Sequence, residues 1–364
     1  MLSFQSRDAF LALVRLGIGN QSFKGYWPYT NADNIDWNEI ETLANEQGLS
    51  AILVDGVECI PDDKRPPKPV LLQWIGNTLQ AYEQRYKLYY QAVADLSGFY
   101  NEHGFKMMLI KGLACGINWP KPEHRPCGDI DIWLFGKQAE ADDVLEKEKG
   151  IKVNKSEHHH TVFYWHDFMV ENHYDFINVH HHKSNSEIEK ILKDLGQDDS
   201  HSVEMNGVKV YMPSPNLYAL FLLKHMMMHF AAEGITLRQL IDWAFFAKAH
   251  HNEVDWDWLL DVLDKYGMKD LFNAFNAICV EDLGFEANIF HQVQFNPVTK
   301  DRVLKDILTP EFSIEPPKNL FKRIFFKFRR WRGNAWKHEL CYKESMWSAF
   351  WTGIWNHILK PSSI

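Results

Sequence analysis

The spacing of hydrophobic and polar positions separates helical stretches at the two ends of the chain from a mixed stretch between them. Near the start, Phe10, Leu13 and Ile18 fall on one face of a helix, and the same spacing recurs near residue 40. Four prolines and five charged residues between Pro61 and Pro69 then predict a loop. The first 69 residues are therefore expected to form a helical segment of their own.

The central stretch changes from helical to strand-like spacing. A long helical pattern runs to His103, and short apolar or alternating runs follow it. Strands are predicted at 105–110, 129–134, 161–165 and 168–176, with a hairpin over 203–211. The hairpin prediction depends on Asn206-Gly207 between β-prone flanks, because that pair favours a two-residue turn.

After Pro215 the pattern turns helical again, with helices predicted at 217–232, 237–250, 256–266 and 269–283. The order of elements predicts an α+β protein, in which a small mixed sheet carries the site and a C-terminal helical domain closes the cleft. The predicted divisions are a helical segment at 1–69, an α/β core at 70–212 and a helical domain at 213–364.

Charge is unevenly distributed along the chain. The net charge is −9, yet eight Lys or Arg and no acidic residue fall between Lys318 and His338, which leaves about −17 elsewhere. This stretch is either a solvated helix with its aromatic residues packed inward, or a surface for nucleic acid or an anionic membrane. A stripe of aromatic and aliphatic residues follows over 347–358, which suits core packing or, less commonly, a membrane or partner contact.

Composition also bears on the setting of the protein. Five scattered cysteines form no CxxC pair, so neither a zinc ribbon nor a disulfide framework is predicted. The N-terminal residues mix charged with apolar positions, which favours an amphipathic helix over a signal peptide. No apolar run is long enough to span a membrane. We therefore expect a reduced, cytoplasmic protein.

Two carboxylates alternate with apolar residues in the strand predicted at 129–134. Side chains two positions apart project from the same face of a strand, so Asp129 and Asp131 point the same way. Adjacent carboxylates repel each other unless a cation lies between them, and oxygen ligands at this spacing suit Mg²⁺. Such a pair alone is a weak signal, because many surface strands contain one.

The surrounding residues strengthen this signal. Lys111-Gly112 follows the strand before it, and glycine lets the backbone approach a ligand closely. A helix that begins there presents free N–H groups to an anion. Arg125 adds a second cation four residues before Asp129. Together these features predict a phosphate site beside a metal site, as phosphoryl or nucleotidyl transfer requires.

The run LIKGLACGINWPKPEHRPCGDIDIWL resembles the core of the DNA polymerase β-type nucleotidyltransferase superfamily. More narrowly, it resembles a bacterial group known as uncharacterised nucleotidyltransferases. Val-Glu-Asn-His at 170–173 is similar to the group's third-carboxylate strand. HMMMHFAAEGITLRQLID is similar to its later helix pair, with matches at His225, His229, Gly234, Arg238 and Asp242. The resemblance covers residues 75–270.

The resemblance implies a reaction. A nucleoside monophosphate would pass from an NTP such as ATP to a small molecule, a protein hydroxyl or an RNA end, and pyrophosphate would leave. Mg²⁺ or Mn²⁺ would be held by Asp129, Asp131 and Glu171. Phosphate oxygens would be held by Lys111, Gly112, Arg125 and Arg238, and the cleft would include His173, His225, His229 and Asp242.

One departure from the family pattern leaves a second hypothesis open. The usual Gly-Ser is Gly112-Leu113 here, so the phosphate-binding hydroxyl is absent and Lys111 would take over that contact. A weak or inactive module of toxin–antitoxin type, binding nucleotide, RNA or a partner protein, is the alternative. Two local alternatives also stay open: Asp175 could replace Glu171, and Arg238 and Asp242 could form a structural ion pair.

Histidine clusters suggest a third hypothesis, a simple metal-binding protein. Triplets occur at 158–160 and 180–182, and His225 and His229 have the i,i+4 spacing that can bind zinc on a helix. No Glu follows His225, so the HExxH pattern is absent. We expect His225 and His229 to be hydrogen-bonded side chains near the site. One or two histidines of the triplets could line the acceptor cleft.

Overall fold

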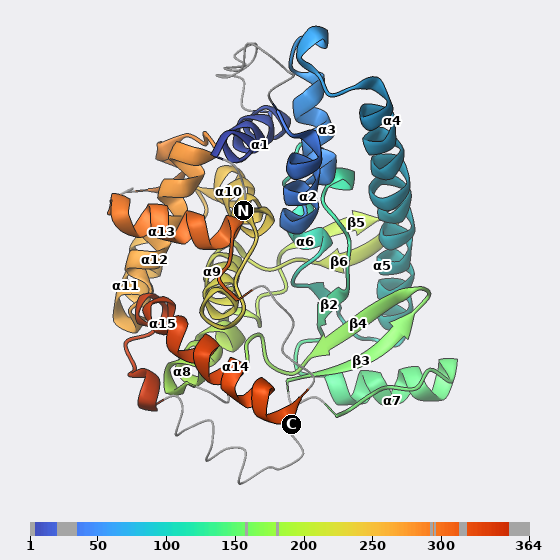
Figure 1. Cartoon of the computed structure of the whole chain (residues 1–364). Coiled ribbons are helices and arrows are strands. Elements are labelled where there is room, and N and C mark those ends of the chain that lie inside the picture. Colours follow the sequence, from blue (N-terminus) through green and yellow to red (C-terminus); the bar gives the residue numbers. More distant parts are fainter. Residues whose placement is uncertain are drawn as a thin grey trace.

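The computed structural model describes residues 4–19, 35–156, 159–179, 182–291, 294, 296–312 and 319–348. A six-stranded mixed sheet lies between the long α4–α5 helix and the helices of the C-terminal half (Figure 1). This arrangement confirms the α+β fold class that the sequence predicts.

In the described residues of the N-terminal part there are three helices: α1 (Phe4–Gly17), α2 (Trp37–Gln47) and α3 (Ser50–Glu58). Helices α1 and α3 cross where glycines let the backbones touch. A Cβ at Gly56 would lie 2.1 Å from the Leu13 carbonyl oxygen, and a Cβ at Gly17 would lie 2.1 Å from that of Ile52. The predicted 61–69 loop contains one 3₁₀ turn, η3 (Asp62–Lys64).

A long helix covers the face of the sheet opposite the site. It consists of α4 (Lys68–Asn77), a π-helical stretch η4 (Thr78–Gln84) and α5 (Arg85–Glu102). Tyr89 packs edge-on against Phe168, with ring centroids 5.1 Å apart. Ser97 Oγ and Asn101 Nδ2 donate hydrogen bonds of 2.8 and 3.0 Å to the Lys209 carbonyl. These contacts fix α5 across the sheet, from β4 to β6.

The sheet has the strand order β3-β4-β2-β1-β6-β5. Its strands are β1 (Met108–Leu109), β2 (Ile130–Trp133), β3 (His160–Trp165), β4 (Phe168–His173), β5 (Ser202–Met205) and β6 (Val208–Tyr211). β2 runs parallel to β4, and β1 parallel to β6. The predicted hairpin joins β5 to β6, with Asn206 and Gly207 at φ 50° and 78°.

Four helical segments connect the strands: α6 (Leu113–Gly116), η5 (Pro122–His124), α7 (Gln138–Lys149) and α8 (Lys183–Leu195). α7 packs on the same face as α5, where Asp142 accepts hydrogen bonds of 2.8 Å from Thr161 and Asn172. The sequence did not predict α8. Its few apolar residues, Ile188 and Leu192 among them, lie on the buried face.

The C-terminal half is helical, as predicted. It contains α9 (Pro215–Ala232), α10 (Leu237–His250), α11 (Trp256–Tyr266), α12 (Lys269–Ala277), η6 (Ile278–Asp282), η7 (Ala287–Phe290), α13 (Pro297–Leu308), α14 (Leu320–Gly333) and α15 (Ala335–Cys341). Thr236 and Gln239 form a capping box that starts α10. Apart from Trp347, the aromatic stripe over 347–358 lies outside the described residues.

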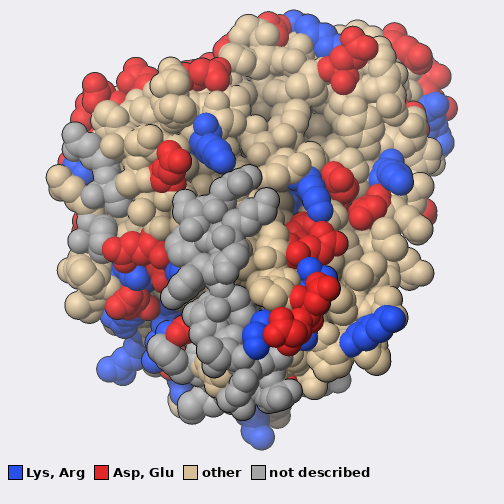
Figure 2. All heavy atoms as spheres, turned by 90° about the horizontal axis from the view of Figure 1, so that it is seen from above, with Lys and Arg blue, Asp and Glu red and all other residues tan. Residues whose placement is uncertain are grey.

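Buried hydrophobic residues from all parts of the described chain form one continuous cluster, from Ala9 to Tyr342. The division into three domains stays a prediction. On the face seen in Figure 2, Lys and Arg are interspersed with Asp and Glu, so neither sign of charge covers that face. None of the helices in the described ranges combines the length and apolar composition that a membrane span requires.

Candidate active site

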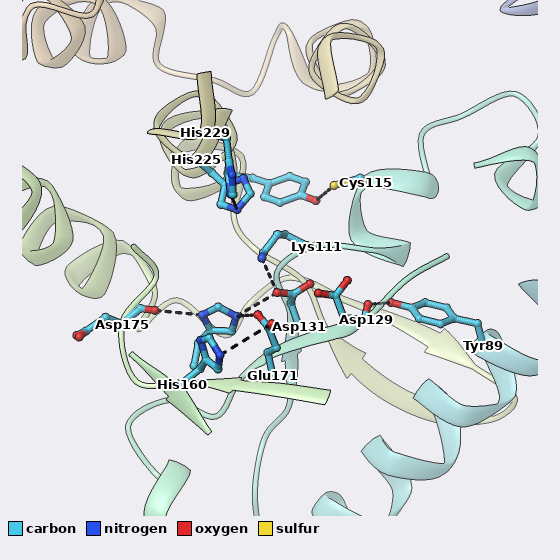
Figure 3. A network of polar contacts seen from close by, with 12 residues as sticks. Tyr89, Lys111, Cys115, Asp129, Asp131, His160, Glu171, Asp175, His225 and His229 are labelled. Atoms are coloured by element: carbon cyan, nitrogen blue, oxygen red, sulfur yellow. Dashed lines mark hydrogen bonds and ion pairs between the residues drawn. The ribbon is translucent and has the colours of Figure 1, made fainter. Parts of the chain in front are cut away.

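The register of the sheet brings three carboxylates together. β2 and β4 are parallel with Asp131 opposite Glu171, and Asp129 immediately precedes β2. Oxygens of Asp129, Asp131 and Glu171 all lie within 4.8 Å of one another. We call these residues the carboxylate trio; Figure 3 shows them converging from adjacent strands. Ile130 and Ile132 point into the core and are fully buried, as the alternation predicts.

Asp131 is the most strongly ionised member of the trio. Burial opposes its ionisation, but Lys111 Nζ at 2.5 Å and His173 Nε2 at 3.0 Å hold the pKa of Asp131 well below its usual range. Burial, and then the charge of Asp131, raise the pKa of Asp129. For Glu171, burial is outweighed by the hydrogen bond from His173 together with the charges of Lys111 and His160, and the pKa of Glu171 is lowered.

Lys111 lies directly above the trio in Figure 3. Burial disfavours its charge, but Asp131 outweighs burial and raises the pKa of Lys111. The next residue must be glycine, because Gly112 has φ 62° and a Cβ there would lie 2.2 Å from Tyr89 Oη. That hydroxyl donates a 2.7 Å hydrogen bond to the Asp129 carbonyl. Nothing in the motif foreshadowed Tyr89, which lies 40 positions before Asp129.

The turn after Lys111 offers less to an anion than the sequence suggested. α6 has four residues, too few for a helix terminus to act as an anion site. Leu113 is 7% exposed and packs into the core, so this position supplies no polar contact. Lys111 is therefore the charged group that this turn presents to the site.

Arg125 forms an ion pair with Asp242 of the C-terminal half. Its Nε and Nη2 donate to the two carboxylate oxygens of Asp242 at 2.8 and 2.9 Å, and its Nη1 donates to the Pro126 carbonyl at 3.2 Å. Trp119 Nε1 donates to the same carboxylate at 2.9 Å. The ion-pair partner of Asp242 is thus Arg125 instead of Arg238, and the phosphate contact predicted for Arg125 stays a prediction.

Arg238 lies close to the Arg125–Asp242 ion pair and does not take the place of Arg125 in it. Burial, followed by the charge of Arg125, lowers the pKa of Arg238. Its side chain passes Gly48, where a Cβ would lie 3.4 Å from Arg238 Cδ. Its contact with phosphate also stays a prediction.

The two histidines of α9 form the wall opposite the sheet. His225 Nε2 and His229 Nε2 are 3.2 Å apart, and Figure 3 shows both above Lys111. Burial, and then the nearby Lys111 charge, lower the pKa of both rings, well below the ordinary value for His225. Both are therefore neutral at pH 7, and a proton shared between their facing nitrogens accounts for the contact.

His173 and the described histidines of the two triplets lie either at the site or away from it. His160 and His173 face the trio, and His159 lies beside them with a pKa lowered to about 4 by burial and its neighbouring rings. His182 stacks on Tyr342, with ring centroids 3.7 Å apart. His158, His180 and His181 lie outside the described residues.

The alternative third carboxylate has another partner. Asp175 forms an ion pair with Lys193 of α8, and its side chain points away from the trio in Figure 3. The geometry therefore groups Glu171, and not Asp175, with Asp129 and Asp131. The catalytic roles of Asp129, Asp131 and Glu171 stay predictions.

Residues 33–283, about two thirds of the chain, match a family model described as uncharacterised nucleotidyltransferase. The chain belongs to this uncharacterised nucleotidyltransferase family. The match extends over the whole carboxylate trio, over α9, which carries His225 and His229, and over α10, which carries Arg238 and Asp242. The narrower placement in a bacterial group of the polymerase β-type superfamily stays a prediction.

Comparisons with curated proteins and with solved structures add less information about this nucleotidyltransferase. A search of curated proteins finds no match. Among solved structures, that of an antigenic nucleotidyltransferase-like protein from Paracoccidioides brasiliensis is 13% identical. The alignment covers 56% of this chain and 96% of that one, with a TM-score of 0.34.

Proposed function

We propose that this nucleotidyltransferase moves a nucleoside monophosphate from an NTP, such as ATP, to a hydroxyl acceptor, with Mg²⁺ or Mn²⁺ held by the carboxylate trio. The observation that carries the proposal is the convergence of three carboxylates within 4.8 Å. A small molecule, a protein or an RNA end could supply the hydroxyl. The five free thiols support a reducing compartment such as the cytoplasm.

The donor set of the trio fits the metal that the family implies. Hard divalent cations prefer carboxylate oxygens. The raised pKa of Asp129 reflects burial and repulsion from Asp131, and a cation between the two side chains would relieve that repulsion. When bound, the cation supplies charge neutralisation at the triphosphate and acidifies the acceptor hydroxyl.

The chain's own residues would position the reacting groups. Lys111, now paired with Asp131, lies where it can exchange that carboxylate for a phosphate oxygen. The acceptor oxygen bonds to the α-phosphorus while the bond to the bridging oxygen breaks, and pyrophosphate leaves with the electron pair. Glu171, with 18% of its side chain exposed against 3% for Asp131, is the carboxylate better placed to receive the hydroxyl proton.

A screen for pyrophosphate release tests the proposal. The four NTPs are supplied in turn with Mg²⁺ or Mn²⁺, and a cell extract provides the pool of acceptors. Asp131→Asn keeps the shape of the side chain but removes charge from the trio. Losing ~4 kcal/mol of transition-state stabilisation would lower the rate on the order of 10³-fold.

Asp175→Asn is the matched control, because it makes the same chemical change four residues along from Glu171, at a carboxylate paired with Lys193. We expect it to retain most of the wild-type rate. Equal pyrophosphate release from the wild type and Asp131→Asn would overturn the proposal.

A further inference from the structure

Two histidines extend the trio along the same face of the sheet. β3 and β4 are antiparallel with His160 directly opposite His173. Glu171 is two positions before His173, so its side chain projects from the same face. The face therefore carries a patch of imidazole nitrogens next to the carboxylates, and Figure 3 shows the His160 ring directed at Glu171.

The shortest distance in this patch matches that between two ligands of a single metal ion, and the other is about half an ångström longer. His173 Nε2 is 3.4 Å from Glu171 Oε2, and His160 Nε2 is 3.9 Å from Glu171 Oε1. One ligand atom from each of the three residues lies within 4.8 Å of the others. Two atoms bound at ~2.1 Å to one ion lie ~3.0 Å apart at a right angle and ~3.4 Å apart at a tetrahedral angle.

The hydrogen bonding of His173 directs its Nε2 into this space. Its Nδ1 lies 3.2 Å from the Asp175 carbonyl oxygen, which can only accept, so Nδ1 carries hydrogen. Its Nε2 then faces Asp131 Oδ1 at 3.0 Å as well as Glu171. Metal-binding histidines commonly donate their second N–H to a backbone carbonyl in this way. In the absence of an ion, a proton on Nε2 bridges to the two carboxylates, and a metal ion bound there would take the place of that proton.

We propose that His160, Glu171 and His173 form a second cation site, which takes a first-row ion of the Mn²⁺ or Zn²⁺ class and shares Glu171 with the trio. Imidazole nitrogen favours such ions over Mg²⁺, which retains oxygen ligands and water. The chain would then hold two chemically different sites side by side, one of oxygen ligands and one of mixed nitrogen and oxygen ligands. This inference rests on the proposed function only through the shared Glu171.

Pulsed electron paramagnetic resonance of Mn²⁺ added to the full chain tests the site. Nitrogen bound directly to Mn²⁺ gives a ¹⁴N hyperfine coupling, which oxygen ligands do not. We expect this coupling in the wild type and its loss in the double variant His160→Gln/His173→Gln. Mn²⁺ affinity should fall at least tenfold in each single variant. Circular dichroism confirms that the variants are folded.

His225→Gln is the matched control, because it removes an imidazole on α9, across the site from the sheet, and should leave the coupling unchanged. Mn²⁺ binding without ¹⁴N coupling, or coupling that survives the double substitution, would overturn the inference. So would loss of the coupling in His225→Gln.

The variant Asp129→Asn separates this inference from the proposed function, because it alters the trio and leaves all three ligands of the second site. We expect it to lose pyrophosphate release and to keep the ¹⁴N coupling. Release by the wild type without coupling would defeat this inference alone. Coupling without any release would defeat the proposed function alone.

Discussion

Asp129 and Asp131 lie two positions apart in the sequence and have different environments. Asp131 is 2% exposed and is stabilised as an anion by Lys111 and His173. Asp129 is more accessible, and its backbone carbonyl is held by Tyr89. Asp131 is therefore ionised before any ligand arrives, whereas Asp129 gains most from an incoming cation.

The contact between Gly112 and Tyr89 leads to a prediction at this scale. In Gly112→Ala the new Cβ would collide with Tyr89 Oη, and the backbone would be strained at φ 62°. Strain of about 1–2 kcal/mol and a lost hydrogen bond of about 1 kcal/mol should lower the free energy of unfolding by ~2–3 kcal/mol. Chemical denaturation measures this difference.

Gly136→Ala provides the control, because Gly136 also has positive φ, at 84°, while its Cβ would meet no atom within 4 Å. It should lose only the strain energy. Adding Tyr89→Phe to Gly112→Ala should recover part of the stability, because it removes the colliding oxygen. Equal losses for the two alanine variants would show that the Tyr89 contact is unimportant.

Local spacing was enough to predict some site residues but not their partners. The alternation over 129–134 placed both aspartates on one face, and the family resemblance chose Glu171. The ion-pair partner of Asp175 is Lys193 of α8, a helix that the mostly polar sequence did not predict. The pairing of Arg125 with Asp242 spans 117 positions, so no local pattern could reveal it.

At the scale of elements, the sequence located most helices and strands and misjudged some lengths. The strand predicted at 105–110 is reduced to the two residues of β1, and the one predicted at 168–176 ends at His173. There the amides of Tyr174 and Asp175 turn to the His159 carbonyl, at 2.8 and 3.2 Å. Apolar runs indicate burial, but the ladder partners that define strand ends come from distant segments.

The basic stretch at 318–338 includes α14, and its contact with other molecules stays a prediction. Phe325 and Phe328 are 64% and 51% exposed among exposed cations such as Lys327. Exposed rings among cations favour an anionic membrane surface over an inward-packed helix. We expect the protein to sediment with phosphatidylglycerol vesicles and not with phosphatidylcholine vesicles. Phe325→Ser/Phe328→Ser should weaken binding ~10²-fold.

Leu88→Ser is the control for this measurement, because Leu88 is an exposed apolar residue of α5, with 63% exposure. It should leave vesicle binding unchanged. Salt should weaken the wild-type interaction, since surface charges are screened. Undiminished binding by the double variant, or a preference for single-stranded RNA over vesicles, would count against the membrane prediction.

At the scale of the whole molecule, the buried Lys224 makes stability depend on pH. Lys224 is 1% exposed, and its Nζ lies 4.2 Å from the Tyr342 ring centre. Burial lowers the pKa of Lys224 to about 8, below its value of 10.5 when exposed. The unfolded chain therefore binds the proton more tightly, and this group stabilises the fold as pH rises from 8 towards 10.5.

Lys224→Met should remove this dependence. The stability of the wild type relative to the variant should increase by about 2 kcal/mol between pH 7.5 and 9.5. Urea denaturation at the two pH values measures this change. Lys248→Met, at an exposed position of α10, should show no comparable change. A wild-type advantage that stays constant with pH would contradict the prediction.

The Arg125–Asp242 pair has a consequence for recombining members of the family. One partner comes from the loop before β2 and the other from α10, so a chimera joined between β6 and α9 would inherit them from different parents. If one parent had a different residue at either position, a buried charge would lose its counter-ion, at a cost of roughly 3–5 kcal/mol. The two halves can be exchanged only as a compatible set, and these two positions are the first to compare when parents are chosen.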